Sequence, residues 1–196
     1  MKRFLALAFF LVVATLGLRA QEAPEGLFIN SKAPDFKGKD QQGNEIRLKD
    51  LLKKGKVVLV FYRGQWCPYC NKQLQRLSDS LELIQAKGAT VIAVSPELPE
   101  NVQKVAEKTK ASFSIISDEK LKIMKAYDVE YEVPENVLTR YRNSGLKIEE
   151  NNGPNGKFLP IPAVYIIDKE GYVTYRYFNQ DYKKRPTVQE ILDNLK

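Results

Sequence analysis

The stretch Val57–Cys70, which reads VVLVFYRGQWCPYC, decides the fold of this 196-residue chain. Its first six residues are continuously apolar and rich in β-branched and aromatic side chains, which is typical of a strand buried on both faces of a parallel sheet. After the second cysteine, apolar residues recur at helical spacing from Leu74 to Ile84, and Lys87-Gly88 ends the pattern. The stretch therefore predicts a central strand that leads through a short turn into a helix.

Strands and helices alternate on both sides of this stretch, which predicts an α/β domain with helices flanking a central sheet. The other expected elements are a hairpin around 40–48, a helix over 48–54, strands at 89–95 and 113–116, helices over 99–110 and after Asp118, a helix within 134–141, a loop at 151–156, a hairpin of strands 163–167 and 172–178, and a final helix over 187–195. Because the late hairpin adds antiparallel strands to parallel ones, we expect the sheet to be mixed.

The amino terminus has the pattern of a secretory leader. Lys2 and Arg3 precede an apolar run that is shorter than the roughly 20 residues a membrane-spanning helix needs, and the run ends at the small residue Ala20. We therefore expect a signal peptide at 1–20, a flexible lead-in at 21–35 and one domain at 36–196. The mature protein is then expected to be exported to the bacterial periplasm and free of the membrane; an uncleaved leader that acts as an anchor is the alternative.

Overall charge points to no nucleic-acid partner. The net charge is +7, but three of the 31 basic residues lie in the leader, so 28 basic residues face 24 acidic ones in the remainder. These charges are scattered among each other rather than gathered in one run, which is the pattern of an ordinary solvated surface.

The chain has only two cysteines, Cys67 and Cys70, and no histidine. A disulfide between them would close a very small loop and would stabilise the fold little, so a purely structural disulfide is the weaker interpretation. Structural zinc takes four Cys or His ligands, and cysteine-protease chemistry needs a histidine as base. We therefore expect no metal or other cofactor and a redox role for the pair.

The position of the pair favours a reactive Cys67. Both cysteines fall where the helix begins, with Pro68 near the first helical position, where its missing N–H does no harm. The free N–H groups and the positive end of the helix dipole stabilise a thiolate at Cys67. Cys70 lies almost one turn further on the same side, where it can resolve a mixed disulfide or a sulfenic acid.

Three neighbouring side chains each have two interpretations. Arg63 either stabilises the Cys67 thiolate or is a solvated loop charge. Trp66 and Tyr69 either pack around the end of the strand or shield the cysteines and contact a partner. The residues alone leave these alternatives open.

The segment from Phe61 to Asn71, FYRGQWCPYCN, together with LPIPA at 159–163 and DYKKRP at 181–186, resembles the peroxiredoxin-like branch of the AhpC/TSA (alkyl hydroperoxide reductase/thiol-specific antioxidant) family. The resemblance covers about residues 30–195. It implies a thioredoxin-like fold, an antioxidant thiol activity and Cys67 in the peroxidatic position. The fold also implies a proline after a cis peptide bond beside the cysteines, for which Pro162 is the candidate; a plain edge or turn proline is the alternative.

The chain departs from the peroxiredoxin pattern at three places. Val60 stands where that pattern has proline, Gly64 where it has the Thr or Ser that binds peroxide, and Pro162 near the place of its arginine. What remains complete is the dithiol beside a candidate cis-proline, which is the equipment of thiol–disulfide exchange.

Three functions follow as hypotheses. The first is a dithiol oxidoreductase in which Cys67 attacks, Cys70 resolves and Pro162 orders an external thiol or disulfide protein partner. The second is a thiol-dependent peroxidase that reduces hydrogen peroxide or alkyl hydroperoxides and is restored by a thiol donor. The third is a binding domain with an inert disulfide. The first is favoured because of Val60, Gly64 and Pro162.

Overall fold

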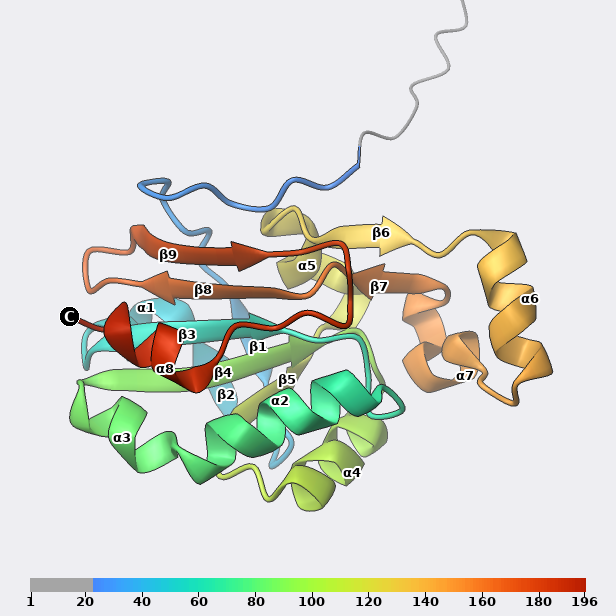
Figure 1. Cartoon of the computed structure of the whole chain (residues 1–196), viewed down its shortest axis with the longest axis horizontal. Helices are drawn as coiled ribbons and strands as arrows, with labels where there is room; N and C mark the ends of the chain where they lie inside the picture. The colour runs from blue at the N-terminus through green and yellow to red at the C-terminus, as the bar shows by residue number, and fades with distance from the viewer. Residues whose placement is uncertain (1–22) are drawn as a thin grey trace, which may run out of the picture.

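A five-stranded sheet with the strand order β5-β4-β3-β8-β9 forms the centre of the computed structural model, which describes residues 23–196 (Figure 1). The predicted signal peptide lies outside the described residues. Strands β3, β4 and β5 are parallel, and β8 and β9 are antiparallel to their neighbours. The strands are β3 (Lys56–Phe61), β4 (Ala89–Ser95), β5 (Ser114–Ser117), β8 (Ala163–Ile167) and β9 (Val173–Phe178). The prediction of a central mixed sheet flanked by helices is confirmed.

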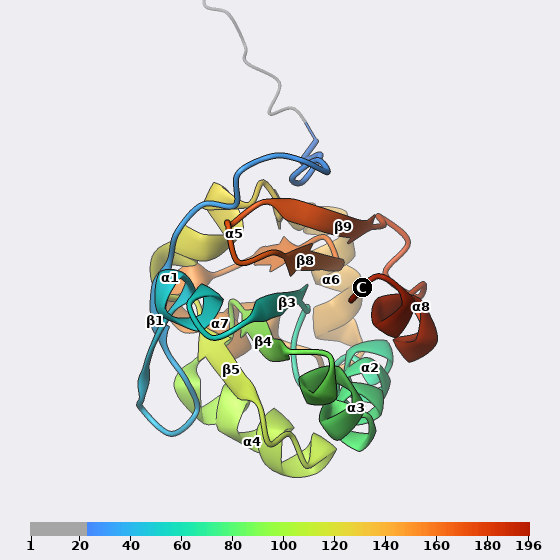
Figure 2. The ribbon, with the colours of Figure 1, turned by 90° about the vertical axis from the view of Figure 1, so that its left-hand side faces the viewer.

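Both faces of this sheet are covered (Figure 2). Val58 and Val60 of β3 pack on one side, whereas Val57, Leu59 and Phe61 pack on the other, as the period of two along a strand requires. The first face carries α2 (Pro68–Asp79), α3 (Leu81–Ala86), α4 (Pro99–Thr109) and α8 (Val188–Asp193). The second carries α1 (Leu48–Leu52) and α5 (Lys122–Ala126), which follows the short helix η1 (Glu119–Leu121). The central strand is therefore buried on both faces, as its sequence predicts.

Two expectations differ from the structure in detail. The helix expected after the cysteines is interrupted at Ser80, whose backbone angles (φ −116°, ψ 13°) separate α2 from α3. The loop expected at 151–156 is wrong in part, because α7 (Ile148–Asn152) and η2 (Gly153–Asn155) occupy it. The reason is tertiary: the buried Asn155 amide donates hydrogen bonds to Pro96 O (2.7 Å) and Asp118 O (2.9 Å), which holds these turn-forming residues in a helical turn.

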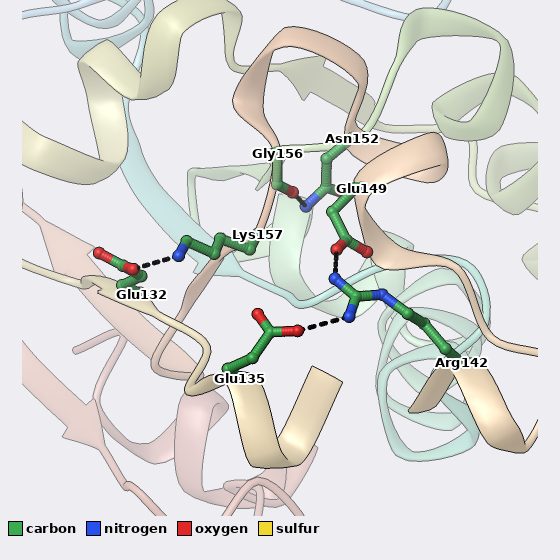
Figure 3. Close-up of polar contacts among 7 residues, drawn as sticks. All are labelled: Glu132, Glu135, Arg142, Glu149, Asn152, Gly156 and Lys157. Atoms are coloured by element: carbon green, nitrogen blue, oxygen red, sulfur yellow. Dashed lines mark hydrogen bonds and ion pairs between the residues drawn. The ribbon is translucent and has the colours of Figure 1, made fainter. Parts of the chain in front are cut away.

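Residues 130–160, termed the β6–β7 segment, extend beyond the central sheet (Figure 1). They contain β6 (Glu130–Glu132), α6 (Glu135–Asn143), α7, η2 and β7 (Phe158–Pro160), with β6 and β7 paired antiparallel. Figure 3 shows Arg142 of α6 between Glu135 and Glu149, and Lys157 on Glu132 at 2.5 Å. Arg142 thus ties α6 to α7, and Lys157 ties the β7 end of the segment to β6. Tyr141 of α6 reaches the residue that follows β3 and Tyr62, because its hydroxyl accepts a hydrogen bond from Arg63 Nη2 at 2.6 Å.

The amino-terminal part of the described chain runs along the edge of the sheet. In the predicted lead-in, the Asn30 amide donates to Val173 O (2.8 Å) and the Ala33 amide to Gly171 O (2.9 Å). The predicted hairpin follows as β1 (Lys37–Lys39) paired with β2 (Glu45–Arg47). Within residues 23–196, no helix combines the length and the apolar character that crossing a membrane requires.

Candidate active site

The two cysteines lie at the junction of β3 and α2. Cys67 precedes the helix in an extended conformation (φ −87°, ψ 111°), and Pro68 is the first residue of α2. The Cys67 carbonyl accepts the first helical hydrogen bond, from the Asn71 amide at 3.0 Å. Cys70 follows on the first turn, and both cysteines are fully buried free thiols. The predicted position of the pair at the start of the helix that follows the central strand is therefore confirmed. Proline tolerates the first helical position, which is why Pro68 marks this start.

The pKa values of the two thiols are shifted in opposite directions. A hydrogen bond from the Cys70 side chain, the Cys70 backbone N–H and the charges of Arg63 and Arg185 outweigh burial and lower the pKa of Cys67 to about 6. Burial, and then the hydrogen bond to Cys67, raises the pKa of Cys70 well above its usual range. At neutral pH the pair therefore holds one thiolate, at Cys67, and one thiol, at Cys70.

We expect the alkylation rate of reduced protein by iodoacetamide to rise with pH around a midpoint of about 6, because the thiolate is the reactive form. Below the midpoint Cys67 is protonated and slow. Cys70→Ala removes the hydrogen bond to the thiolate, and Arg63→Met removes a positive charge, so both variants should move the midpoint upward. A matched Lys108→Met variant, on the exposed side of α4, should leave it in place. A midpoint near 9 in the unchanged protein would contradict this assignment.

Arg63 is buried beside the thiolate, so its interpretation as a solvated loop charge is wrong. It is only 2% exposed. Its Nη2 donates to the Tyr141 hydroxyl at 2.6 Å, and its guanidinium lies 4.8 Å from the Trp66 ring and 4.1 Å from the Tyr182 ring. Since rings hold this cation without neutralising it, its charge remains available to the Cys67 thiolate.

Trp66 and Tyr69, the aromatic residues beside the cysteines, differ in their surroundings: one is packed and the other is exposed. Trp66 packs against two apolar clusters and lies 6.0 Å from the Tyr141 ring of the β6–β7 segment. Tyr69 is 41% exposed, and its ring meets Tyr182 edge-on at 6.0 Å. Packing therefore describes Trp66, whereas Tyr69 presents a ring to the surface next to the pair.

Arg185 is a site residue that the sequence analysis missed. Its Nη2 donates to Cys70 Sγ at 3.3 Å, and its Nε donates to Gln73 Oε1 at 2.8 Å. It comes from the segment 181–186, far along the chain. The DYKKRP motif of that segment contributes to the family resemblance, but nothing in the local sequence connects its arginine to a cysteine.

Glu97 is a second residue that the sequence analysis missed. It follows β4, which pairs in parallel with β3 in the register Phe61 to Val94, so the residues after both strands meet at one edge of the sheet. Its side chain is fully buried, and Oε2 accepts the Gln65 amide at 2.7 Å. Burial raises the pKa of this carboxyl to about 8. A charged residue two positions after the end of a buried strand was the available signal in the sequence.

Gly64 is enclosed by the same side chains. A Cβ at this position would lie 2.8 Å from Glu97 Oε1 and 2.4 Å from Trp66 Nε1, both of which are closer than normal contacts. A threonine or serine would therefore overlap with a buried carboxyl and an indole ring. The space in which the peroxiredoxin pattern has a hydroxyl is filled here.

The expected cis peptide bond before Pro162 is wrong. No peptide bond within residues 23–196 is cis. The Ile161 amide donates to Val129 O at 2.7 Å, and the chain continues extended from β7 into β8. Pro162 is buried and lines a cavity of about 430 Å³ together with Tyr131 and Tyr182, two rings that also approach Arg63. Pro162 is therefore connected to the site through the tyrosine rings that surround Arg63.

In the described part of the chain, no group of three or more Cys, Asp or Glu side chains is close enough to hold a metal ion. The site therefore consists of two sulfurs, two arginines, one buried carboxyl and a set of tyrosine rings. This arrangement can hold a thiolate, keep a second thiol protonated and exchange disulfides.

Comparison with known proteins agrees with the resemblance. The AhpC/TSA family model matches residues 29–176. The chain is 28% identical over 146 residues to the thiol-disulfide oxidoreductase ResA of Geobacillus thermodenitrificans, covering 74% of this chain and 66% of ResA, slightly less than two thirds. It is 32% identical over 166 residues to the chloroplastic peroxiredoxin Q of Sedum lineare, covering 84% and 76%.

Solved structures share the fold at lower identity. Peroxidoxin BcpB of Mycobacterium tuberculosis has a TM-score of 0.66 at 22% identity, over 85% of this chain and 95% of that one. A cysteine-to-serine mutant of the peroxiredoxin 6 of Arenicola marina has a TM-score of 0.69 at 17% identity, over 87% and 72%. These neighbours bear out the thioredoxin-like fold. With its family-model match over most of its length and a relative above 30% identity, the chain belongs to the AhpC/TSA family.

Proposed function

We propose that this protein is a thiol–disulfide oxidoreductase whose chemistry is carried by Cys67 and Cys70. The observation that supports it is the pair of buried thiols with opposite pKa shifts, Cys67 lowered to about 6 and Cys70 raised. The Cys67 thiolate attacks one sulfur of a partner disulfide, the S–S bond breaks, and the other partner sulfur leaves as a thiolate. Cys70 then loses its proton, attacks Cys67 Sγ and releases the second partner sulfur. Two electrons pass to the partner, and an external thiol reductant restores the dithiol.

The surrounding residues have supporting roles in this proposal. Arg63 and Arg185 both stabilise negative charge on the Cys67 sulfur, and Arg185 also contacts Cys70 Sγ. Pro68 starts the helix whose N–H groups face Cys67, Trp66 packs Arg63 in place, and Tyr69 contacts the partner. Since neither sulfur is exposed, a partner reaches Cys67 only after side chains above it move. Pro162 lines the cavity beside the tyrosines that would move.

The second candidate is a thiol-dependent peroxidase, which the peroxiredoxin relatives favour. The Cys67 thiolate would attack a peroxide oxygen and break the O–O bond. Cys67 would become a sulfenic acid, and the other oxygen would depart as water or an alcohol. The Cys70 thiol would then condense with the sulfenic acid to form a disulfide and release water. The filled space around Gly64 argues against this reaction, because no hydroxyl is there to bind the peroxide.

Export belongs to the proposal as well. We propose that the leader at 1–20 is removed and that the protein works in the periplasm, where disulfide-bonded partners occur. Mass spectrometry of the protein recovered from cells tests this, since cleavage after Ala20 leaves a chain that begins at Gln21. A chain that retains its leader in the membrane fraction would support the anchored alternative.

One experiment separates the candidates. Reduced protein is mixed in stopped flow with hydrogen peroxide, an alkyl hydroperoxide or a disulfide-bonded protein, with Cys67→Ser as the control. We expect fast oxidation by the protein disulfide and slow oxidation by both peroxides. Fast oxidation by peroxide alone would overturn the oxidoreductase proposal, and no reaction with any oxidant would support an inert binding domain.

A further inference from the structure

A groove of about 480 Å³ begins beside the cysteine pair, between α2 and the segment 183–188 with α8. Its floor is apolar and includes Leu77 and Ile191. Its walls carry five cationic side chains and no carboxylate. The five are Lys72, Arg76, Lys183, Lys184 and Arg185.

No carboxylate in the described part of the chain pairs with these cations, of which Arg185 also contacts Cys70 Sγ. The nearest acids along the chain have other hydrogen-bond partners. Asp79 accepts the Gln75 side-chain amide at 2.9 Å, Glu190 accepts the Tyr175 hydroxyl at 2.7 Å, and Asp181 accepts the Lys183 backbone amide at 3.1 Å. Like charges gathered at this density repel each other, so an anionic ligand would relieve a standing repulsion.

Gln73 adds an independent sign of a binding site. It lines the groove, is only 6% exposed, and its Nε2 has no hydrogen-bond partner in the described part of the chain. Buried amide donors almost always have a partner in native proteins. Its Oε1 is held by Arg185, so the amide presents a donor and cannot be reversed without losing that contact.

The groove is continuous with the dithiol. Arg185 contacts Cys70 at one end, and Tyr69, the neighbour of Cys70, forms part of the wall. From Tyr69 to Leu77 the helix rises about 12 Å, which matches three to four residues of extended chain at about 3.3 Å each. A chain in the groove would therefore have its acidic residues a few positions from a cysteine placed at the pair.

We propose that this groove binds an acidic extended segment of the protein whose disulfide Cys67 attacks. The inference rests on the proposed function and names the partner's chemistry: two or more Asp or Glu side chains within about four residues of the reactive cysteine. Arginine and lysine pair strongly with carboxylates, and complementary charge raises the association rate. A nucleic acid is disfavoured because the groove is short, apolar at its floor and ends at sulfur chemistry.

The test uses peptides in which one cysteine carries a chromogenic aryl thiol as a mixed disulfide. One peptide has two glutamates within four residues of the cysteine, a second has glutamines there and a third has lysines. We expect reduced protein to attack the glutamate peptide about tenfold faster than the glutamine peptide at low salt, with the preference fading as salt rises. In Lys72→Glu/Arg76→Glu the preference for glutamate should disappear or invert toward lysine.

A matched variant controls for general charge. Lys49→Glu/Lys108→Glu makes the same change in net charge at exposed positions of α1 and α4, and it should keep the preference. Thermal melts of both variants are to be measured as the control for folding. Equal rates for the glutamate and glutamine peptides in the unchanged protein would overturn the inference, as would an equal loss of preference in both variants.

Calorimetry separates this inference from the proposed function. A glutamate peptide with serine in place of cysteine should bind the unchanged protein and not Lys72→Glu/Arg76→Glu, even if no disulfide exchange occurs. Binding without exchange would overturn the proposed function and keep the acidic groove. Exchange without binding or charge preference would overturn only the inference that the groove binds an acidic segment. Tighter binding of a single-stranded oligonucleotide than of the peptide would also overturn it, because the ligand would then be a nucleic acid.

Discussion

Cys67→Ser is expected to abolish disulfide exchange, with a fall in rate of at least about a thousandfold, because a serine hydroxyl stays protonated where the thiolate forms at a pKa of about 6. Cys70→Ser should behave differently. It keeps the attacking sulfur but lacks the resolving one, so a one-to-one mixed disulfide with the substrate protein should accumulate. Non-reducing electrophoresis and mass spectrometry of the adduct measure this directly.

The comparison between the two variants identifies their roles. Since Cys70 donates the hydrogen bond that lowers the pKa of Cys67, Cys70→Ser should be assayed up to about pH 9 as well as at neutral pH. The double variant should form no adduct. Accumulation of an adduct on Cys70 in Cys67→Ser, or full turnover in Cys70→Ser, would reverse or remove the assigned roles.

Glu97→Gln should stabilise the reduced protein increasingly as pH rises. The pKa of Glu97 is about 8 in the folded protein and near 4.5 in the unfolded chain, so the folded state binds the extra proton between these values. The stability that the protonated carboxyl contributes is present below about pH 4.5 and is lost as pH rises toward 8. The loss amounts to about 1.4 kcal/mol per pH unit, or a few kcal/mol in all.

Denaturant unfolding of both proteins from about pH 5 to about pH 9 tests this expectation. Cys67 has the opposite dependence, because its lowered pKa contributes stability above about pH 9 that is lost as pH falls to about 6. That contribution is present in both proteins and cancels in their difference. Glutamine still accepts the Gln65 amide, so the contact with the turn is kept. A difference that does not change with pH would show that the Glu97 carboxyl is not held protonated.

The burial of Glu97 also bears on the choice between the two candidate functions. Its Oε1 would lie 2.8 Å from a Cβ at Gly64, and Trp66 Nε1 would lie 2.4 Å from the same Cβ. Restoring the peroxiredoxin residue by Gly64→Thr alone would thus create an overlap rather than a peroxide site. The departure at Gly64 is therefore accompanied by two neighbouring side chains, Glu97 and Trp66, that leave no room for a Cβ.

The sequence by itself determined the features that depend on near neighbours. The apolar run Val57–Tyr62 gives a buried strand because both of its faces are apolar. Pro68 marks the first helical turn because it lacks an N–H, and the turn Asp168–Gly171 joins two strands of alternating pattern. The arrangement of the cysteines on this frame follows from spacing of three along a helix. These are local properties, and the residues that cause them lie within one turn or one strand.

Only the tertiary structure decided the charges around the sulfurs. Arg63 contacts Tyr141 over a separation of 78 residues, Gln65 contacts Glu97 over 32, and Arg185 contacts Cys70 over 115. Whether a cation is solvated or buried, and whether a carboxyl keeps its proton, depends on what packs against it from distant elements. Those contacts carry no periodic signal in the chain, so the acidity of Cys67 and the basic groove beside it emerge only when the sheet and its helices bring these segments together.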